Sequence, residues 1–353
     1  MKWLPIVLVL VAIRLALIAL HVESSDMPWI EAGHRHDSGW YQKIALNGYP
    51  ADPKDLGEPY VQTEWAFFPL YPLLIRATMS VGFSDPVLAM EVLSWPLMIL
   101  AVIGFAGLSR RLLSERTAHF ALLLFVCFPF SIFLHVHYSE ALFLSLLFAS
   151  FNAIHDRRSV VASFLLAALV LVRPSGLFML PPALLFHMER SGHLFSDPRH
   201  YHRSLWIAIP AVICFSAYTF FQFQMTGDPF AFSSAQAGWG RRLSWPWESF
   251  FSSGDIATQI ESIYTILLIP FAIFLLKDQP RSFQLLVLIN ILMPLLSGSV
   301  DSMTRFTLVM FPLFLGLAEK IGSWKRPWPV LAIMLFLQTI CVWLWSKGHM
   351  LMA

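Results

Sequence analysis

The chain has 353 residues, of which 57% are hydrophobic and only 13% are charged, and its mean hydropathy is +0.64. Soluble domains contain roughly 25% charged residues, so this composition excludes a soluble fold and predicts a protein that lipid partly solvates. The formal net charge of +2 says little about binding partners. We expect the protein to contact the lipid bilayer and not to bind nucleic acid. The three cysteines lie inside apolar runs, which argues against a disulfide framework.

The first predicted element is an apolar run over residues 4–20, which follows Lys2. A cleaved signal peptide would end in a small-residue cleavage site, and the sequence His21-Val22-Glu23-Ser24 fits one poorly. We therefore predict a retained transmembrane helix. Ten further apolar runs predict, together with it, an all-α polytopic membrane protein of about eleven spans: roughly 4–20, 86–108, 117–134, 140–154, 160–172, 176–189, 204–224, 256–276, 282–298, 305–318 and 328–345.

The runs 160–172 and 176–189 are short for two spans, which need about 20 residues each. Because Pro174 and Gly176 interrupt them, we predict two short helices that meet at a tight turn. With the N-terminus inside, the short inner loops then carry more Lys and Arg than the longer outer segments, as is usual in membrane proteins. If residues 160–189 formed a single span, every segment after residue 190 would lie on the opposite side of the membrane, and the bias of Lys and Arg toward the inner loops would be weaker.

This topology predicts one membrane domain over residues 1–353, in which the outer segments 21–85 and 225–255 form the candidate active-site face. A short amphipathic helix on the membrane surface is predicted in the first segment from apolar residues at helical spacing, Trp40, Tyr41, Ile44 and Ala45. Asn47-Gly48 supplies its end. The aromatic, proline-broken stretch 65–72 predicts a second interfacial element.

Asp37 immediately precedes this helix and has two open interpretations. Aspartate is a good N-cap, because its carboxylate accepts backbone N–H bonds in the first helical turn; the same carboxylate is a candidate catalytic base. His34 and His36 lie beside it, but an H-x-H-D pattern without a distant partner is weak evidence for a metal site. We therefore expect no cofactor, without excluding a divalent metal.

An ordered set of short motifs runs through the chain. Its first members are Asp37-Ser38-Gly39-Trp40-Tyr41 through Ile44-Ala45 to Gly48-Tyr49, and Ala66-Phe67-Phe68-Pro69-Leu70-Tyr71-Pro72. Further along follow Tyr138-Ser139-Glu140, Arg173-Pro174-Ser175-Gly176, Thr226-Gly227-Asp228-Pro229-Phe230-Ala231-Phe232, Ala235-Gln236 with Trp239-Gly240-Arg241, and Arg305-Phe306 leading to Phe311-Pro312-Leu313-Phe314. Over residues 35–315 this set resembles the bacterial relatives of GPI mannosyltransferase II, the PIG-V-like group of the GT-C superfamily of polytopic glycosyltransferases.

The resemblance implies a GT-C-like transferase in a bacterial plasma membrane, with its active site on the non-cytoplasmic face. It implies transfer of a sugar, mannose in this group, from a polyprenyl-phosphate donor to a lipid or glycan acceptor. The family's first-loop aspartate falls on Asp37, which the resemblance implies to be the catalytic base. The residue before that aspartate is often Trp in the family and is His36 here, a difference that concerns the donor or acceptor pocket.

Sugar transfer from a phosphate leaving group needs a base for the acceptor hydroxyl and cations that hold the phosphate. The candidate phosphate-binding residues are Arg173, Arg305 and Arg241, although snorkelling to the interface also explains an arginine at a helix end. The candidates for binding or orienting substrate are Glu140, His137, Tyr41 and Trp239. Each also has an ordinary structural interpretation. Glu140 can be a favourable carboxylate in the first turn of a helix, His137 a satisfied histidine, and the aromatic residues interfacial anchors. The sequence has no phosphate-cradling glycine loop, which disfavours a nucleotide-sugar donor.

Two other functions fit the same sequence. A lipid-linked sugar flippase or another transporter explains the spans and the basic helix ends without a base. Transporters, however, place polar residues near the bilayer midplane, often within inverted repeats, whereas here the polar residues gather at one face. A non-catalytic membrane subunit of a glycan-assembly complex is the third interpretation. The leading prediction is an integral-membrane, inverting glycosyltransferase.

Overall fold

The computed structural model describes residues 3–24, 27–51, 56–192, 198–250, 256–322, 324 and 327–352. Residues 25–26, 52–55 and 251–255 of the predicted outer segments, and 193–197 of a predicted inner loop, lie outside the described residues. Within the described ranges every regular element is an α-helix or a short 3-10 helix. The all-α prediction is therefore confirmed.

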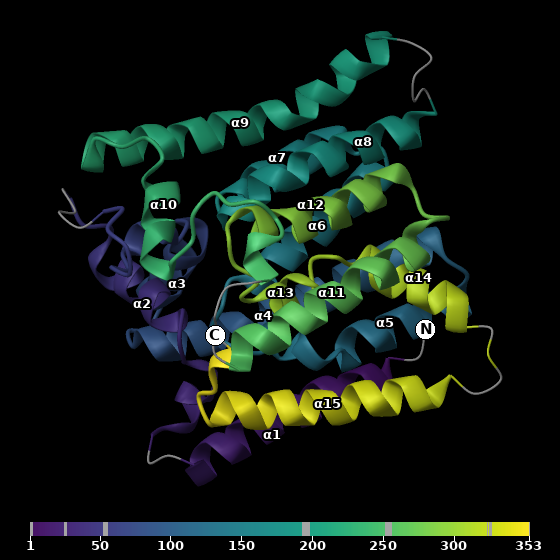
Figure 1. The fold of residues 1–353 in the computed structure, drawn as a ribbon, viewed down its shortest axis with the longest axis horizontal. Coiled ribbons are helices and arrows are strands. Elements are labelled where there is room, and N and C mark those ends of the chain that lie inside the picture. The colour runs from purple at the N-terminus through teal and green to yellow at the C-terminus, as the bar shows by residue number, and fades with distance from the viewer. Residues whose placement is uncertain are drawn as a thin grey trace.

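Most of the helices lie side by side along the long axis of the molecule (Figure 1). Five helices are long and apolar enough to cross a membrane: α1 (Leu4–Ser24), α4 (Pro86–Leu112), the Ser204–Thr226 part of α9 (Pro198–Thr226), α11 (Ile256–Leu276) and α15 (Trp328–Ser346). Three apolar helices are shorter: α6 (Glu140–His155), α7 (Ser159–Val170) and α12 (Arg281–Leu296). The chain is thus a multi-pass membrane protein, and the number of eleven spans stays a prediction.

Aromatic side chains fill the centre of the bundle. Phe148 of α6 lies 5.2 Å, centroid to centroid, from Phe105 of α4 and 5.5 Å from Phe311. The outer helices instead expose large apolar side chains, such as Phe220 of α9 and Phe336 of α15. Apolar surface of this extent marks contact with a membrane or another apolar partner, in agreement with the composition.

The predicted spans 117–134 and 305–318 are not continuous helices, and in both a proline explains the break. Within 117–134, α5 (Glu115–Cys127) ends before Pro129, and Pro129–Leu134 form the buried 3-10 helix η3. The run 305–318 is divided into α13 (Met303–Phe306) and α14 (Pro312–Ile321). Proline has no N–H and clashes with the turn before it, so it starts a helix more readily than it continues one.

The chain reverses direction between α7 and α8 (Leu180–Ser191), with the short 3-10 helix η4 (Pro174–Met179) at the turn. Ser159 Oγ at the start of α7 lies 3.1 Å from His187 Nε2 near the end of α8, so the two helices run antiparallel. A Cβ on Gly176 would lie 2.4 Å from the Leu169 carbonyl oxygen, which requires glycine at this close approach. The predicted pair of short helices is therefore present, and the turn carries Arg173.

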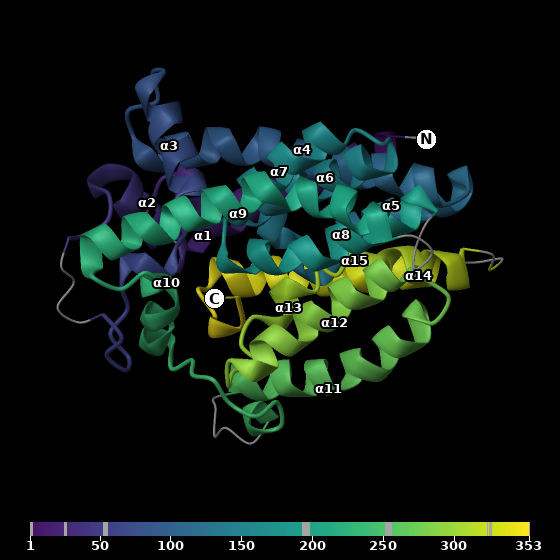
Figure 2. The same cartoon turned by 90° about the horizontal axis from the view of Figure 1, so that it is seen from above.

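The short helices α2 (Ser38–Asn47), α3 (Leu70–Ser80) and α10 (Ala231–Ser234) gather at one end of the molecule (Figure 2). The helix predicted after Asp37 is confirmed as α2, which ends at Asn47 before Gly48 with a φ of +75°. Its predicted apolar face is buried at Tyr41, Ile44 and Ala45.

The stretch 65–72 differs from the predicted surface element. It contains the end of the 3-10 helix η2 (Glu64–Ala66) and the beginning of α3. Trp65, Phe68 and Tyr71 are at most 1% exposed. These aromatic residues therefore pack inside the protein, where they support the end of the molecule that carries α2.

Candidate active site

A cavity of about 670 Å³ is lined by residues from the segments that the motifs singled out. Its walls come from α2, from residues 62–68 and 232–241, from the turn at Arg173, and from α11, α12 and α13. Of the eight predicted site residues, six line this cavity: Asp37, Tyr41, Arg173, Trp239, Arg241 and Arg305. Glu140 and His137 do not line it.

Asp37 occupies the N-cap position of α2, but its side chain does not cap the helix. Its Oδ2 instead accepts a hydrogen bond from Arg305 Nη1 at 3.0 Å. The Asp37 backbone N–H donates to Tyr138 Oη at 3.2 Å, which fixes the start of α2. The capping interpretation of the carboxylate is therefore not realised, and the side chain is directed to a cation in the cavity wall.

Glu140 lies between two of the predicted arginines. It is 2% exposed, at the first residue of α6. Its Oε1 accepts a hydrogen bond from Arg173 Nη1 at 2.8 Å and lies 3.4 Å from Arg305 Nε. Two carboxylates and two guanidinium groups thus alternate in the order Asp37, Arg305, Glu140 and Arg173. A buried carboxylate is stable in such a place only when it is paired, and here it orients both arginines.

Arg241 differs from Arg173 and Arg305 because its side chain bonds a neutral residue rather than a carboxylate. Its Nη1 donates to the amide oxygen of Gln236 at 3.2 Å, and among the described residues no carboxylate lies within ion-pair distance of it. Burial, and then the nearby positive charge of Arg305, lowers the pKa of Arg241. A half-buried cation without an acidic partner is a suitable contact for an anionic ligand.

Aromatic rings form the wall beside these charges. Trp40 stacks with Phe67 at 5.9 Å between centroids, and Trp239 lies 6.0 Å from Trp40 and 5.6 Å from Phe67. Tyr41 is buried behind them, with its hydroxyl 2.8 Å from Ser139 Oγ. Burial raises the pKa of Tyr41, so its hydroxyl keeps its proton at neutral pH. This wall offers flat apolar surface to a lipid chain or a sugar face.

The loop that carries Gln236, Trp239 and Arg241 is fixed through Gly238. A Cβ on Gly238 would lie 2.4 Å from the Val61 carbonyl oxygen. We expect Gly238→Ala to destabilise the protein by about 1–3 kcal/mol, as overpacked sites do. Thermal unfolding in detergent measures this, with Gly39→Ala as the matched control because its Cβ would meet nothing within 4 Å. Equal melting temperatures for the two variants would contradict the tight contact.

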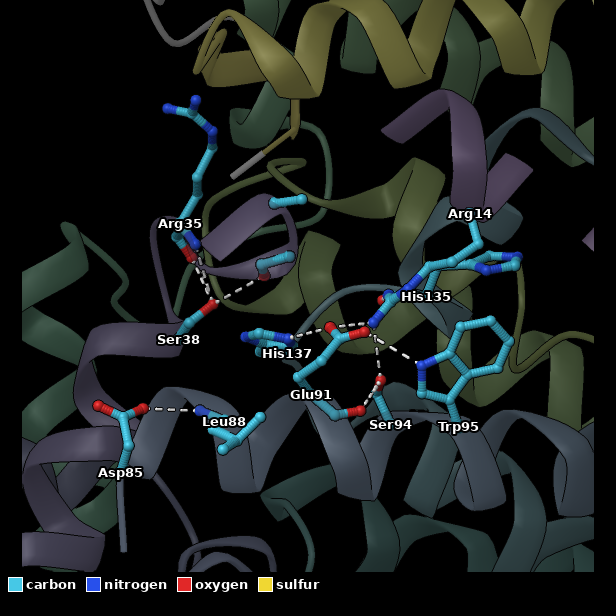
Figure 3. A network of polar contacts seen from close by, with 12 residues as sticks. Arg14, Arg35, Ser38, Asp85, Leu88, Glu91, Ser94, Trp95, His135 and His137 are labelled. Atoms are coloured by element: carbon cyan, nitrogen blue, oxygen red, sulfur yellow. Dashed lines mark hydrogen bonds and ion pairs between the residues drawn. The ribbon is translucent and has the colours of Figure 1, made fainter. Parts of the chain in front are cut away.

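His137 lies outside the lining of the cavity. It is fully buried, and its Nε2 lies 3.0 Å from Glu91 Oε2 of α4. Arg14 of α1 donates to the same oxygen, and Trp95 Nε1 donates to Glu91 Oε1 at 3.1 Å (Figure 3). The His137 backbone N–H donates to the Gly33 carbonyl at 2.9 Å. His137 therefore joins the chain before Asp37 to a buried polar network.

Arg14 and Glu91 are not among the predicted site residues, although the sequence carries a signal for them. Each is an ionisable residue inside a predicted span, and such residues usually face the bundle interior and pair with each other. The same signal applies to Glu261 of α11, which is 3% exposed and lines the cavity.

The two histidines before Asp37 are held neutral at pH 7. Burial lowers the pKa of His34 to about 4, and burial likewise lowers the pKa of His36. His36 lines the cavity, with its ring 5.8 Å from that of Trp345 in an edge-on arrangement. In the described part of the chain, no three His, Cys, Asp or Glu side chains are grouped so that they could hold a metal ion.

No family model and no curated protein matches the sequence. The structure is similar to that of ArnT from Cupriavidus metallidurans bound to undecaprenyl phosphate, with a TM-score of 0.60 and 12% identity over 94% of this chain and 63% of that chain. It is also similar to ArnT in the apo state, with a TM-score of 0.55 and 12% identity over 98% of this chain and 76% of that chain.

A third similar structure is the Archaeoglobus fulgidus oligosaccharyltransferase in complex with Zn and sulfate. Its TM-score is 0.51 and its identity 14%, over 97% of this chain and 53% of that chain. At these identities the likeness concerns the fold, and the predicted GT-C-like fold is confirmed. This chain spans 63% of the ArnT chain with bound lipid and 53% of the oligosaccharyltransferase chain.

Proposed function

We propose that the protein is an integral-membrane glycosyltransferase, which moves a sugar from a polyprenyl-phosphate donor to a hydroxyl of a lipid or glycan acceptor. The observation that carries the proposal is the ion pair between Asp37 and Arg305 in the cavity wall, at 3.0 Å. It places a carboxylate that can act as a base beside a cation that can contact a phosphate. The ArnT structure with bound undecaprenyl phosphate supports a lipid phosphate as the ligand of this fold.

In the proposed step, Asp37 takes the proton of the acceptor hydroxyl as its oxygen attacks the anomeric carbon of the sugar. The bond between that carbon and the phosphate oxygen breaks, and polyprenyl phosphate leaves with one additional negative charge. One displacement inverts the anomeric carbon. Among the described residues no hydrogen bond reaches Asp37 Oδ1, so this oxygen is available for the proton while Oδ2 stays with Arg305.

The three arginines have different roles in the proposal. Arg241, whose recorded side-chain partner is the neutral Gln236, contacts the donor phosphate and stabilises the charge that grows on it. Arg305 contacts the phosphate and also bonds the base, Asp37. Arg173 completes the positive side of the cavity and is held by Glu140 at 2.8 Å. Trp239 and Trp40 contact the prenyl chain or the sugar.

We further propose that the sugar is mannose and that the protein is of the PIG-V-like subtype. We place it in the plasma membrane, with its active site on the non-cytoplasmic face. The ordered motifs support the sugar and the subtype. The distribution of Lys and Arg among the loops supports the location. The cavity supports the location too, because residues of both predicted outer segments line it.

The donor class is tested with detergent-purified protein and a lipid and glycan extract of the host. The label is supplied either as mannosyl-phospho-polyprenol or as GDP-mannose. We expect a labelled product from the lipid-linked donor alone. Product from GDP-mannose alone would contradict the proposal.

The proposal assigns no cofactor, because three arginines already supply positive charge to the cavity. The transfer rate in excess EDTA is expected to equal the rate in magnesium-containing buffer. A rate that falls in EDTA and returns with added divalent metal would contradict this part of the proposal.

A further inference from the structure

Arg305 is carried by an unusually short element. Helix α13 contains only Met303–Phe306 and begins after Ser302, whose φ of +69° lies in the left-handed region. The side chain of its N-cap residue, Ser302, makes no capping hydrogen bond with the first turn of the helix. The Met303 and Phe306 N–H groups bond the Val300 and Ser302 carbonyls just before the helix. The Thr304 N–H, in the first turn, needs a partner from elsewhere.

Glu261 of α11 supplies the missing contact. Its Oε2 accepts the backbone N–H of Thr304 at 3.0 Å, and its Oε1 accepts the Thr304 hydroxyl at 2.6 Å. Thr304 is the second residue of α13, the position whose N–H an N-cap side chain normally satisfies. Glu261 thus caps α13 from a neighbouring helix. A second contact joins α11 to the residue that follows α13, because Tyr264 Oη donates to Thr307 Oγ1 at 2.9 Å.

We propose that Glu261 is a positioning residue for sugar transfer, which acts by holding α13 so that Arg305 meets both Asp37 and Glu140. This inference rests on the proposed function. Thr304 is the residue before Arg305, so a displacement of its N–H moves the guanidinium group with it. A shift of about 1 Å in a catalytic arrangement can reduce the rate by about 100-fold. Glu261 also lines the cavity, so direct contact with substrate is the alternative that the experiment must separate.

The first arm of the experiment needs no enzyme activity. Hydrogen exchange of the peptide that contains residues 303–307 is compared in the wild type, Glu261→Met and Glu261→Gln. Methionine keeps the length of the side chain but removes both acceptors, so we expect faster exchange at Thr304. Glutamine keeps one acceptor oxygen, so it is expected to retain most of the protection. Unchanged exchange in Glu261→Met would overturn the inference, even if the protein transfers no sugar.

The second arm measures turnover with mannosyl-phospho-polyprenol. We expect Glu261→Met to lower kcat by about 10- to 100-fold with little change in the KM for donor, and Glu261→Gln to restore most of it. Thr265→Val is the matched control, because the Thr265 hydroxyl bonds the Glu261 backbone carbonyl at 2.7 Å rather than its carboxylate. This control is expected to keep full activity.

A double-mutant cycle separates positioning from the alternatives. If Glu261 acts through Arg305, then Glu261→Met adds little to the loss caused by Arg305→Gln. Losses that multiply in the double mutant, or a KM for donor that rises with Glu261→Met, would show direct substrate contact or general destabilisation and would overturn the inference. Absence of transfer by the wild type would contradict the proposed function, while the exchange measurement would still decide whether Glu261 holds α13.

Discussion

Asp37→Asn is expected to lower sugar transfer by about 10²–10⁴-fold, the range that general-base catalysis contributes. An amide cannot take the acceptor proton at neutral pH, but it has the size of the carboxylate, and its oxygen can still accept from Arg305. Membrane insertion and binding of undecaprenyl phosphate are therefore expected to persist. The measurement is the single-turnover rate with labelled mannosyl-phospho-polyprenol, alongside a binding assay with undecaprenyl phosphate.

Asp85→Asn is the matched control for this substitution. Asp85 also precedes a helix, but its Oδ1 caps α4 by accepting the Leu88 N–H at 2.8 Å (Figure 3). Asparagine is as good an N-cap as aspartate, so the control is expected to transfer sugar at the wild-type rate. Full activity of Asp37→Asn would remove Asp37 from the role of base.

Arg241→Gln has the second largest expected effect. Removing one preorganised donor that stabilises developing charge costs about 10²–10³-fold in kcat. We assign this role to the Arg241 guanidinium because no carboxylate of the described residues lies within ion-pair distance of it. Contact with the phosphate in the ground state would in addition raise the KM for donor, so both constants are measured by varying mannosyl-phospho-polyprenol.

Arg242→Gln is the control for charge at this place in the loop. Arg242 is exposed and does not line the cavity, so its replacement is expected to change kcat and KM by less than about 2-fold, as for surface sites in general. Equal losses in the two variants would indicate a general electrostatic effect of the loop and would contradict a specific contact by Arg241.

Local structure near the site was largely predictable from the sequence. The helix after Asp37 follows from the spacing of its apolar residues and from Gly48, and the reversal near Arg173 follows from Pro174 and Gly176. Each of these features depends on a few neighbouring residues, for which helix ends and turn chemistry have specific signals.

The contacts that form the site were not predictable in the same way. Asp37 and Arg305 are 268 positions apart in the chain, and no local pattern indicates that they meet. For that reason capping and catalysis could not be distinguished for Asp37 until its partner was known. The apolar run 256–276 predicts a span, and nothing local in it indicates that Glu261 contacts Thr304.

The aromatic residues illustrate a second limit. In a membrane protein, apolar residues face both lipid and the protein core, so composition alone does not separate the two. Trp65 and Phe68 were assigned to the membrane surface and are buried. The helix breaks at Pro129 and Pro312 were missed for a related reason, because continuous hydropathy concealed them.

We expect that the protein makes a covalent product rather than moving a lipid-linked sugar across the membrane. Sealed proteoliposomes that contain the protein and labelled mannosyl-phospho-polyprenol, together with host lipid acceptor, test both outcomes at once. We expect the label to appear in a new covalent product, with no protein-dependent movement of donor between the two leaflets. Movement of intact donor between the leaflets without any new product would contradict the proposed sugar transfer and identify a transporter.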